Sequence, residues 1–421
     1  MNDIRTPLGT YDLSFDDIEN RDAIFQKVKK ILLCRGATQI ETPVIELYKT
    51  VEKLYGDEFK KLVYVLDDDK DKLFLRYDQT VPLARYVSMN GLTKFRRFQF
   101  GKIYRKDDPQ PSKGRYREFY QLDYDIIGDD QSSGINDLEM LETLHSVIAS
   151  IMGEISFKIK INYKDIVIEM LNKCNIPIDL HKIVFSSIDK LDKKIWEDIQ
   201  TELAEKGICF DAIDQLKSYY AAFNKCNTCG QIVEILKQLD LIPKTTLKYV
   251  DMFLKFMDRM NFRNFIFDPF LIRGMDYYTG MLFEVSAWNK DQMVTIAAGG
   301  RYDNMMEEFS NHGKIPAIGM SLGIDRIVGL VSFEKKNERV PEIYIASIGD
   351  NTIIERVALC SEFRTMGYYV IMSDSLNPKM RSQFSTVFEG YSRMIPVMVI
   401  VGDNEIKEGN LTVKDVIGNK Q

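Results

Sequence analysis

Two long segments with alternating residue character, 94–105 and 117–128, constrain the fold more than any other feature of the chain. Alternation with a period of two is typical of a strand whose two faces meet different surroundings. The polar connection 106–114 contains two prolines and a glycine. The pattern therefore predicts an antiparallel pair of strands joined by a long loop.

Strand and helix signals elsewhere divide the chain into a discontinuous core and two further parts. Strand-like runs occur before residue 162 and resume after 263, whereas helical periodicity dominates the residues between them. Beyond a charged linker, apolar strands alternate with helices in a β-α-β-α-β order, which predicts a small mixed-to-parallel sheet covered on both faces. The expected parts are the core in two pieces, 1–162 and 263–332, a helical insertion, 163–262, the linker, 333–340, and a C-terminal α/β domain, 341–421.

Composition excludes several classes of protein. The 421 residues are enough for two or three domains with their own cores. No apolar run approaches the length of a membrane span, and the first residues lack a signal or transit pattern. Six scattered cysteines suit a reducing compartment. We therefore expect a cytoplasmic protein with no membrane partner. The net charge of −6 neither indicates nor excludes a nucleic-acid partner, since phosphate contacts need only a local basic face.

The stretch FLIRGMDYYTGMLFEV, 270–285, combines residue types that suit a binding site. Arg273 next to a glycine provides a cation with close backbone access, which suits a carboxylate or a phosphate. Tyr277 and Tyr278 provide rigid rings with hydroxyl groups, which suit a small polar heterocycle. In isolation, such a motif is more often the edge of a strand with surface tyrosines.

The segment FRRFQFGKIYRKDDPQPSKGRYREFYQLDYDIIG, 95–128, contains a second group of candidates. Arg105 ends the first predicted strand and could hold a phosphate while the loop closes over it. On the returning strand, Gln121, Asp123 and Asp125 share one face. Buried acidic residues require a cation or a donor, and the ammonium or imidazole of a ligand would satisfy them. The alternative is a solvent-exposed face of an antiparallel sheet.

Two more segments, LRYDQTVPLARY at 75–86 and AIGMSLGIDRIVGLV at 317–331, complete a resemblance to class II aminoacyl-tRNA synthetases, and specifically to histidyl-tRNA synthetases of the eukaryotic and archaeal branch. Segments 95–128 and 317–331 resemble motifs 2 and 3 of the class, and RGMDYYTG resembles the histidine signature. The resemblance implies an α+β fold, with an antiparallel sheet flanked by helices, a helical insertion and a C-terminal α/β domain like those that bind anticodons.

The activity that this resemblance implies is ATP-dependent activation of L-histidine to histidyl-adenylate, followed by transfer to the 3′ end of tRNA(His). The implied partners are L-histidine, ATP with Mg²⁺, tRNA(His) and a second copy of the chain, which would meet the face near the N-terminal helix and residues 94–100. The implied catalytic residues are Arg105 and Arg273. The implied histidine-binding residues are Asp78, Gln79, Thr80, Arg105, Gln121, Asp125, Arg273, Tyr277 and Tyr278. The implied ATP-binding residues are Arg105, Glu118, Phe119 and Arg326, and the candidate tRNA contacts are Gln110 and Lys113.

Individual roles also follow from the resemblance. Asp78, Thr80 and Gln121 would hold the backbone of the amino acid, although Asp78 or Thr80 alone would suggest a helix cap. Asp125 and Tyr278 would bond the nitrogens of the imidazole. Further implied roles are a wall of the pocket for Tyr277, a grip on the substrate carboxylate and the α-phosphate for the two catalytic arginines, and an adenine sandwich for Phe119 and Arg326.

Two alternatives remain from the sequence. One is a non-catalytic relative that senses histidine or tRNA, and the other is a synthetase for proline, threonine or glycine. The presence of Arg105, Arg326 and the C-terminal module favours an active enzyme, because the resemblance implies that histidine-binding regulatory relatives usually lack them. Cys226 and Cys229 form a C-x-x-C pair without the four ligands that a zinc site needs, so no metal site made of protein side chains is expected.

Overall fold

The computed structural model describes residues 4–51, 61–68, 70–128, 133–275, 277–289, 292–309, 313–331, 339–349 and 352–418. By its internal contacts, the chain divides into two compact units, Met1–Ser332 and Phe333–Gln421. Most of the expected linker, 333–340, lies outside the described residues.

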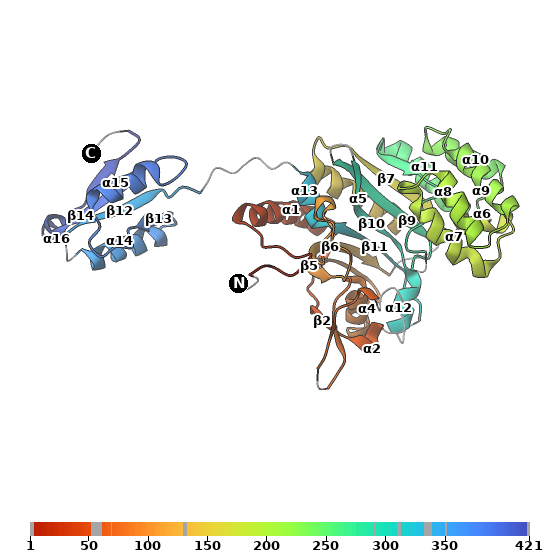
Figure 1. Ribbon diagram of the computed structural model, residues 1–421, viewed down its shortest axis with the longest axis horizontal. Helices are drawn as coiled ribbons and strands as arrows, with labels where there is room; N and C mark the ends of the chain where they lie inside the picture. The colour runs from red at the N-terminus through yellow and green to blue at the C-terminus, as the bar shows by residue number, and fades with distance from the viewer. Residues whose placement is uncertain are drawn as a thin grey trace. The chain divides into compact units, whose positions relative to one another are not determined.

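A large sheet runs through the first unit in the order β1-β5-β6-β11-β10-β9-β7-β8 (Figure 1). Its outer pairs, β1 with β5 and β7 with β8, are parallel, and the other pairs are antiparallel. The expected pair of long strands is confirmed as β5 and β6, in which Phe95 lies opposite Ile127 and Tyr104 opposite Glu118. The strands are β1 (Thr38–Gln39), β5 (Phe95–Tyr104), β6 (Glu118–Ile127), β11 (Ala317–Gly323), β10 (Gln292–Arg301), β9 (Met281–Asn289), β7 (Phe157–Tyr163) and β8 (Phe265–Phe267).

The two faces of this sheet differ in polarity because side chains alternate along each strand. On β6, Leu122, Tyr124 and Ile126 are buried on one face, and the neighbouring helices α5 (Ile135–Met152) and α13 (Ile324–Leu330) pack against strands β11 and β6. Helix α1 (Phe15–Leu33) packs in turn on α5 and α13. The opposite face of β6 carries polar side chains, so this is the face on which a polar site can form.

Helix α1 begins at a reciprocal cap. The Ser14 hydroxyl accepts a hydrogen bond from the backbone N–H of Asp17, and the Asp17 carboxylate accepts one from the backbone N–H of Ser14. Such a capping box satisfies two of the amide groups that have no partner at a helix start.

A smaller antiparallel sheet has the order β2-β4-β3. It packs with the helix α4, which begins at the candidate residue Thr80. Its apolar core includes Phe74, Val81 and Met306, so it joins strand β4 to helices α4 and α12. The elements are β2 (Ile45–Leu47), α2 (Tyr48–Val51), β3 (Val65–Leu66), β4 (Leu73–Leu75), α4 (Thr80–Met89) and α12 (Asp303–Phe309).

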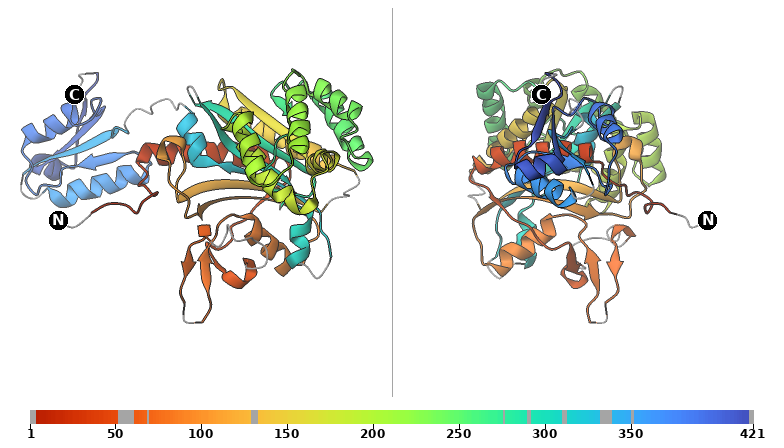
Figure 2. Two further views of the ribbon diagram at one scale, coloured as in Figure 1. Left: turned by 45° about the vertical axis from the view of Figure 1, so that its right-hand side comes forward. Right: turned by 90° about the vertical axis from the view of Figure 1, so that its left-hand side faces the viewer.

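The residues between β7 and β8 form helices. These helices lie beside the end of the large sheet that β7 and β8 form (Figure 2, green). Apolar residues such as Ile199, Leu203 and Leu216 are buried among these helices, which explains why their sequences show helical periodicity. The helices are α6 (Lys164–Lys173), η2 (Ile178–Leu180), α7 (His181–Ile188), η3 (Asp189–Asp192), α8 (Trp196–Glu205), α9 (Phe210–Phe223), α10 (Cys229–Gln238) and α11 (Lys244–Met260).

The second unit is the expected α/β domain with a mixed sheet in the order β13-β12-β14-β15. Strand β12 is parallel to β13 and β14, and β15 is antiparallel to β14. One apolar cluster joins Tyr344 to Val387 of α15, and a second joins Ile345 to Cys360 of α14, so both faces of the sheet are covered. The elements are β12 (Ile343–Ile348), α14 (Ile353–Thr365), β13 (Val370–Met372), α15 (Met380–Glu389), β14 (Val397–Gly402), α16 (Asp403–Glu408) and β15 (Thr412–Asp415).

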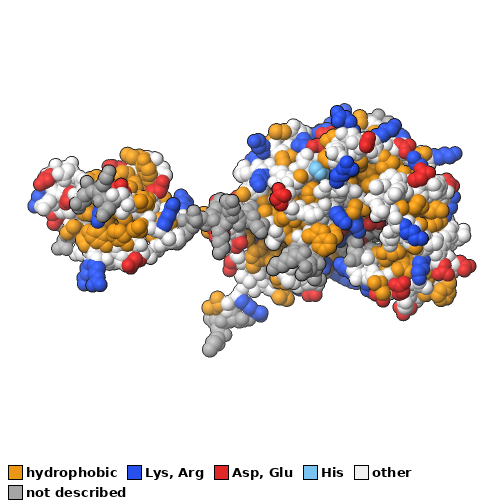
Figure 3. Space-filling model, turned by 90° about the horizontal axis from the view of Figure 1, so that it is seen from above, with side chains coloured by type: hydrophobic (Ala, Val, Ile, Leu, Met, Phe, Trp, Pro, Cys, Tyr) orange, Lys and Arg blue, Asp and Glu red, His pale blue; other side chains and the backbone are white. Residues whose placement is uncertain are grey.

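The surface offers no simple guide to a partner. Basic and acidic side chains are interspersed on the face of the first unit in Figure 3, in keeping with the small net charge. Within the described ranges, no helix combines the length and the hydropathy needed to cross a membrane.

Candidate active site

A cavity of about 440 Å³ opens on the polar face of the large sheet. Its walls come from the turn before α4, the loop after β5, strands β6, β10 and β11, the segment before β9 and the start of α13. The structure thus brings together nine of the residues expected from the sequence, which are Asp78, Thr80, Arg105, Phe119, Gln121, Arg273, Tyr277, Tyr278 and Arg326.

Four arginines line this one cavity: Arg105, Arg115, Arg273 and Arg326. Burial lowers the pKa of the Arg326 guanidinium, and repulsion from the other three arginines lowers it further. Cations that gather in this way favour an anionic ligand, because its charge relieves their mutual repulsion. Arg115 was missed by the sequence analysis, although it stands only a few residues before the candidates Glu118, Phe119 and Gln121.

Glu284 of β9 holds Arg273 at the cavity. Its carboxylate forms an ion pair with Arg273 Nη1 and accepts a hydrogen bond of 2.8 Å from the Thr295 hydroxyl. The Glu284 side chain is only 4% exposed, whereas that of Arg273 is 44% exposed. A buried anchor therefore orients an accessible cation. Glu284 was also missed, and the available signal was a single acid within the apolar run MLFEV.

A bulge in β10 contributes to the position of Arg326, a second arginine of the cavity. The pairing with β9 shifts between Thr295 and Ala297, so Ile296 is an extra residue in the strand. The carbonyl oxygen of Thr295 accepts a hydrogen bond of 2.8 Å from Arg326 Nη1. Bulges often aim groups at functional sites in this way.

Two glycines make room for the ring of Tyr278. Gly274 has a φ of +59°, and a Cβ atom there would lie 2.9 Å from Tyr278 Cε2. A Cβ at Gly300, on β10, would lie 2.8 Å from Tyr278 Cδ1. The glycine after Arg273 was expected to give a ligand close access to the backbone, but the structure uses the space for the tyrosine ring. Asp276, in the same segment, lies outside the described residues.

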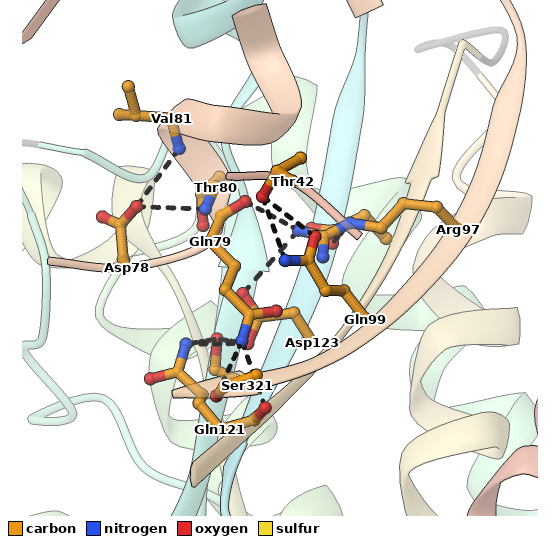
Figure 4. A network of polar contacts seen from close by, with 12 residues as sticks. Thr42, Asp78, Gln79, Thr80, Val81, Arg97, Gln99, Gln121, Asp123 and Ser321 are labelled. Carbon is orange, nitrogen blue, oxygen red and sulfur yellow. Dashed lines mark hydrogen bonds and ion pairs between the residues drawn. The ribbon is translucent and has the colours of Figure 1, made fainter. Parts of the chain in front are cut away.

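Asp78 is both a helix cap and a wall of the cavity. Its Oδ1 accepts hydrogen bonds from the backbone N–H groups of Thr80, at 3.0 Å, and Val81, at 3.2 Å, at the start of α4 (Figure 4). The cap fixes the carboxylate beside Thr80, which lines the same cavity.

Two of the expected residues are directed away from the cavity. Gln79 is wholly buried, and its Nε2 donates to the carbonyl oxygens of Gly101 and Gln121. It therefore supports two strands and does not reach a ligand. Glu118 precedes Phe119 on β6, so their side chains point to opposite faces of the sheet. Glu118 accepts a hydrogen bond of 2.6 Å from Lys102 Nζ, and only Phe119 lines the cavity.

Asp125 also lies behind the cavity wall, and its expected contact with an imidazole stays a prediction. Its Oδ1 accepts a hydrogen bond from the hydroxyl of Tyr302, and its Oδ2 lies 2.8 Å from Arg97 Nε. Gly319 on β11 leaves the space for this carboxylate, because a Cβ there would lie 1.9 Å from Oδ1. The protein itself thus supplies the partners that were expected from a ligand.

Arg97 compensates two buried carboxylates at once. Its side chain is 0% exposed, and its Nη2 lies 3.7 Å from Asp123 Oδ2 while its Nε lies 2.8 Å from Asp125 Oδ2. The approach to Asp125 lacks the alignment of a hydrogen bond, so charge holds the two groups together. Burial raises the pKa of Asp123 to about 7, and it raises the pKa of Asp125 as well, while Arg97 acts in the opposite direction.

This cluster predicts a pH dependence of stability. Because the folded state holds the Asp123 proton more tightly than the unfolded chain does, with its ordinary pKa of about 4, the contribution of Asp123 to the free energy of unfolding falls as pH rises from about 4 to about 7. Asp125 acts with the same sign, and Arg97 limits both effects. Across this range, the free energy of unfolding of D123N relative to that of the native chain should rise with pH, as measured by hydrogen exchange of the β5 and β6 amides. Equal slopes would contradict the assignment.

The candidate tRNA contacts lie on the loop between β5 and β6. Gln110 pairs through its backbone with Arg115, and the short helix η1 (Pro111–Lys113) lies between them. The side chain of Lys113 lies outside the described residues.

The fold defines the surroundings of the C-x-x-C pair and of the other metal-ligating residue types. In the described ranges, no group of three or more His, Cys, Asp or Glu residues could hold an ion. The Cys229 thiol of the C-x-x-C pair accepts a hydrogen bond of 3.2 Å from the backbone N–H of Phe267, and burial raises its pKa. Both observations favour a packed thiol.

Comparisons with known proteins agree with one another. The family model described as histidyl-tRNA synthetase matches residues 9–327. The chain is 33% identical over 440 residues to the cytoplasmic histidine–tRNA ligase of Dictyostelium discoideum, which covers 99% of this chain and 88% of the relative. It is 34% identical over 435 residues to that of Oryza sativa subsp. japonica, covering 99% of this chain and 53% of the relative. The crystal structure of histidyl-tRNA synthetase from Nostoc sp. PCC 7120 has a TM-score of 0.74 at 22% identity, covering 100% of this chain and 96% of the other.

Proposed function

Because the chain belongs to the histidyl-tRNA synthetase family and is a histidine–tRNA ligase, we propose that the cavity on the polar face of the large sheet forms histidyl-adenylate. The observation that carries this proposal is the meeting of four arginines and several hydrogen-bond acceptors around one cavity. Histidine and ATP are both anionic at the atoms that react, and histidine also carries a cation. A site with guanidinium groups next to acceptors matches both substrates.

In the proposed reaction, a carboxylate oxygen of histidine attacks the α-phosphorus of ATP. A new C–O–P linkage forms, the bond between the α-phosphorus and its bridging oxygen breaks, and pyrophosphate leaves with the electron pair. The carboxylate is already ionised at neutral pH, so this step needs no general base. The barrier lies in bringing two anions together and in stabilising the charge of the pentavalent phosphorus. Arg105 and Arg273 meet both needs by position and charge.

The nucleotide half of the proposed site comprises Phe119, Arg115 and Arg326. A ring and a guanidinium that line one cavity can hold an adenine between them by stacking and cation–π attraction. Arg115 adds a cation for the phosphates, with Asp107 holding its guanidinium at 3.0 Å.

The family implies the use of ATP, with which Mg²⁺ is generally expected. The acidic residues that line the cavity are already hydrogen-bonded: Asp78 caps α4, Asp107 binds Arg115, and Asp325 accepts the backbone N–H of Tyr120. We therefore propose that the phosphate oxygens of ATP would hold Mg²⁺, which would supply neutralisation of their charge. This fits its preference for phosphate and water ligands over an all-protein cage.

The amino acid half of the proposed site comprises Asp78, Thr80 and Gln121 for the ammonium group and Tyr277 and Tyr278 for the imidazole. Burial raises the pKa of the Tyr278 hydroxyl, so this group stays protonated and can donate to an unprotonated ring nitrogen. A pocket that hydrogen-bonds its substrate rejects a competitor without the matching groups by roughly 10⁴–10⁵, because its own polar groups lose their partners.

We further propose that transfer to tRNA(His) uses the loop with Gln110 and Lys113, and that the second unit contacts the anticodon. Support comes from the position of the loop beside Arg115 and from the α/β fold of the second unit.

We propose a homodimer through the face near α1, where Phe15 and Leu33 are exposed. Several relatives are named cytoplasmic, which supports the cytoplasm as the location of this chain.

Histidine-dependent exchange of labelled pyrophosphate into ATP tests the proposed adenylation. We expect exchange with histidine and rates lower by roughly 10⁴ or more with each other amino acid. Charging of tRNA(His) transcripts then tests the second step. If no amino acid supported exchange, the non-catalytic alternative would replace this proposal, and exchange with proline, threonine or glycine would reassign the substrate.

A further inference from the structure

Asp123 is a buried residue of β6 that is hydrogen-bonded to the wall of the cavity. It is 1% exposed, and two residues that line the cavity, Gln121 and Ser321, are bonded to it. Gln121 Nε2 donates to Asp123 Oδ1 at 2.7 Å and to the Ser321 hydroxyl oxygen at 3.2 Å. The Ser321 hydroxyl in turn donates to Asp123 Oδ1 at 2.7 Å (Figure 4).

These bonds determine the orientation of the Gln121 amide. An amide has one accepting and one donating end, and only the network around it decides which end points where. A reversed amide would place Oε1 against Asp123 Oδ1, an oxygen that already accepts the Ser321 hydroxyl. Two acceptors would then face each other inside the protein, which is costly. The nitrogen is therefore held toward Asp123, and the oxygen lies on the other side, as Figure 4 shows.

We propose that Asp123 is a positioning residue that locks the Gln121 amide with its carbonyl oxygen toward the cavity, where it accepts a hydrogen bond from the ammonium group of the amino acid substrate. The inference rests on the proposed function of the cavity and adds the reason why Gln121 presents an acceptor. Asp123 itself touches no substrate. It acts through Gln121 and is anchored by Arg97 behind it.

The D123N variant should free the Gln121 amide to reverse its orientation, while the side chain at position 123 keeps nearly the same size. The amide nitrogen of the new asparagine can donate to Gln121 Oε1, so the glutamine can turn its NH₂ group toward the cavity. An NH₂ group facing an ammonium replaces attraction by repulsion. Loss of a hydrogen bond to a charged group predicts a rise of about 10–100-fold in the KM for histidine. The KM for ATP should stay unchanged.

Two inhibitors separate this role from a general loss of structure. Histidinol carries the imidazole and the ammonium, whereas 3-(imidazol-4-yl)propanoate carries the imidazole and the carboxylate without the ammonium. In D123N, the inhibition constant of histidinol should rise in parallel with the KM for histidine. That of the propanoate should stay at its native value. A rise for both inhibitors would overturn the proposal, because a distorted pocket weakens every ligand.

The double variant D123N/Q121E provides a second test, in which the expected result is recovery of function. In that pair, the asparagine nitrogen donates to one oxygen of the new glutamate, and the other oxygen faces the cavity as an acceptor. The KM for histidine should return close to the native value. A KM as high as that of D123N would contradict the lock, since the predicted acceptor would be present without its effect.

The matched control is E118Q, which makes the same change of carboxylate to amide on the opposite face of the same strand. It should leave the KM for histidine and both inhibition constants at their native values. Q121M identifies which idea fails. If Q121M leaves the KM for histidine unchanged, the assignment of Gln121 to the substrate is wrong. If Q121M raises it but D123N does not, only the role of Asp123 is wrong.

Discussion

The Arg273→Ala variant is expected to lose about 10²–10³-fold in the rate constant for adenylate formation, since removal of one preorganised charge from a transition state costs about 2.7–4 kcal/mol. Arg273 lines the cavity, and Glu284 orients its guanidinium. In the proposed reaction, this group faces charge that grows as the carboxylate meets the phosphorus. Single-turnover formation of histidyl-adenylate measures the effect without a contribution from product release.

Two further variants serve as comparisons for the expected loss of rate in R273A. R263A removes an exposed arginine that does not line the cavity, and it should keep the native rate constant. E284Q should cause a smaller loss than R273A, because the guanidinium remains but is less firmly oriented. A native rate constant in R273A would remove this residue from the mechanism.

The Arg97→Ala variant is expected to have the largest effect on stability, a decrease of about 3–5 kcal/mol in the free energy of unfolding at neutral pH. Without the guanidinium, the carboxyl groups of Asp123 and Asp125 share a buried site with no cation between them. The loss should shrink as pH falls, because protonation of the two carboxyl groups removes the unpaired charge. Since the chain has two compact units, hydrogen exchange of the β5 and β6 amides measures the relevant unfolding.

Arg35→Ala serves as the comparison for this effect. Arg35 binds Glu142 at 2.7 Å, but the two side chains are 19% and 31% exposed. Partly exposed ion pairs contribute about 0–1 kcal/mol, so R35A should cost far less than R97A. Similar losses in the two variants would show that Arg97 does not compensate the buried pair.

The fold was largely predictable because its signals are local. Alternation along 94–105 and 117–128 depends only on neighbouring residues, and it predicted the antiparallel pair β5 and β6. Apolar strands between helices likewise predicted a mixed sheet in the second unit. The alternation also indicated that Gln121, Asp123 and Asp125 share one face.

Depth below that face was not predictable, because it depends on residues from distant parts of the chain. Gln121 reaches the cavity, whereas Asp125 is covered by Arg97 of β5 and by Tyr302, which lies between β10 and α12. Arg115 and Glu284 were overlooked for a related reason. An arginine in a loop and an acid in a strand can be recognised as parts of a site only when the fold shows them near the other charges of the cavity.

The single extra residue Ile296 lies next to Thr295, and contacts of Thr295 help to hold two arginines of the cavity. Thr295 uses its hydroxyl to hold Glu284, which orients Arg273, and its carbonyl oxygen to hold Arg326. Deleting one residue here would restore a regular ladder and turn the side chains on one side of the deletion to the opposite face. The contacts that hold Arg273, through Glu284, and Arg326 would then change together. The irregularity of β10 thus couples the placement of these two guanidinium groups, so a change of register in this one strand would move both.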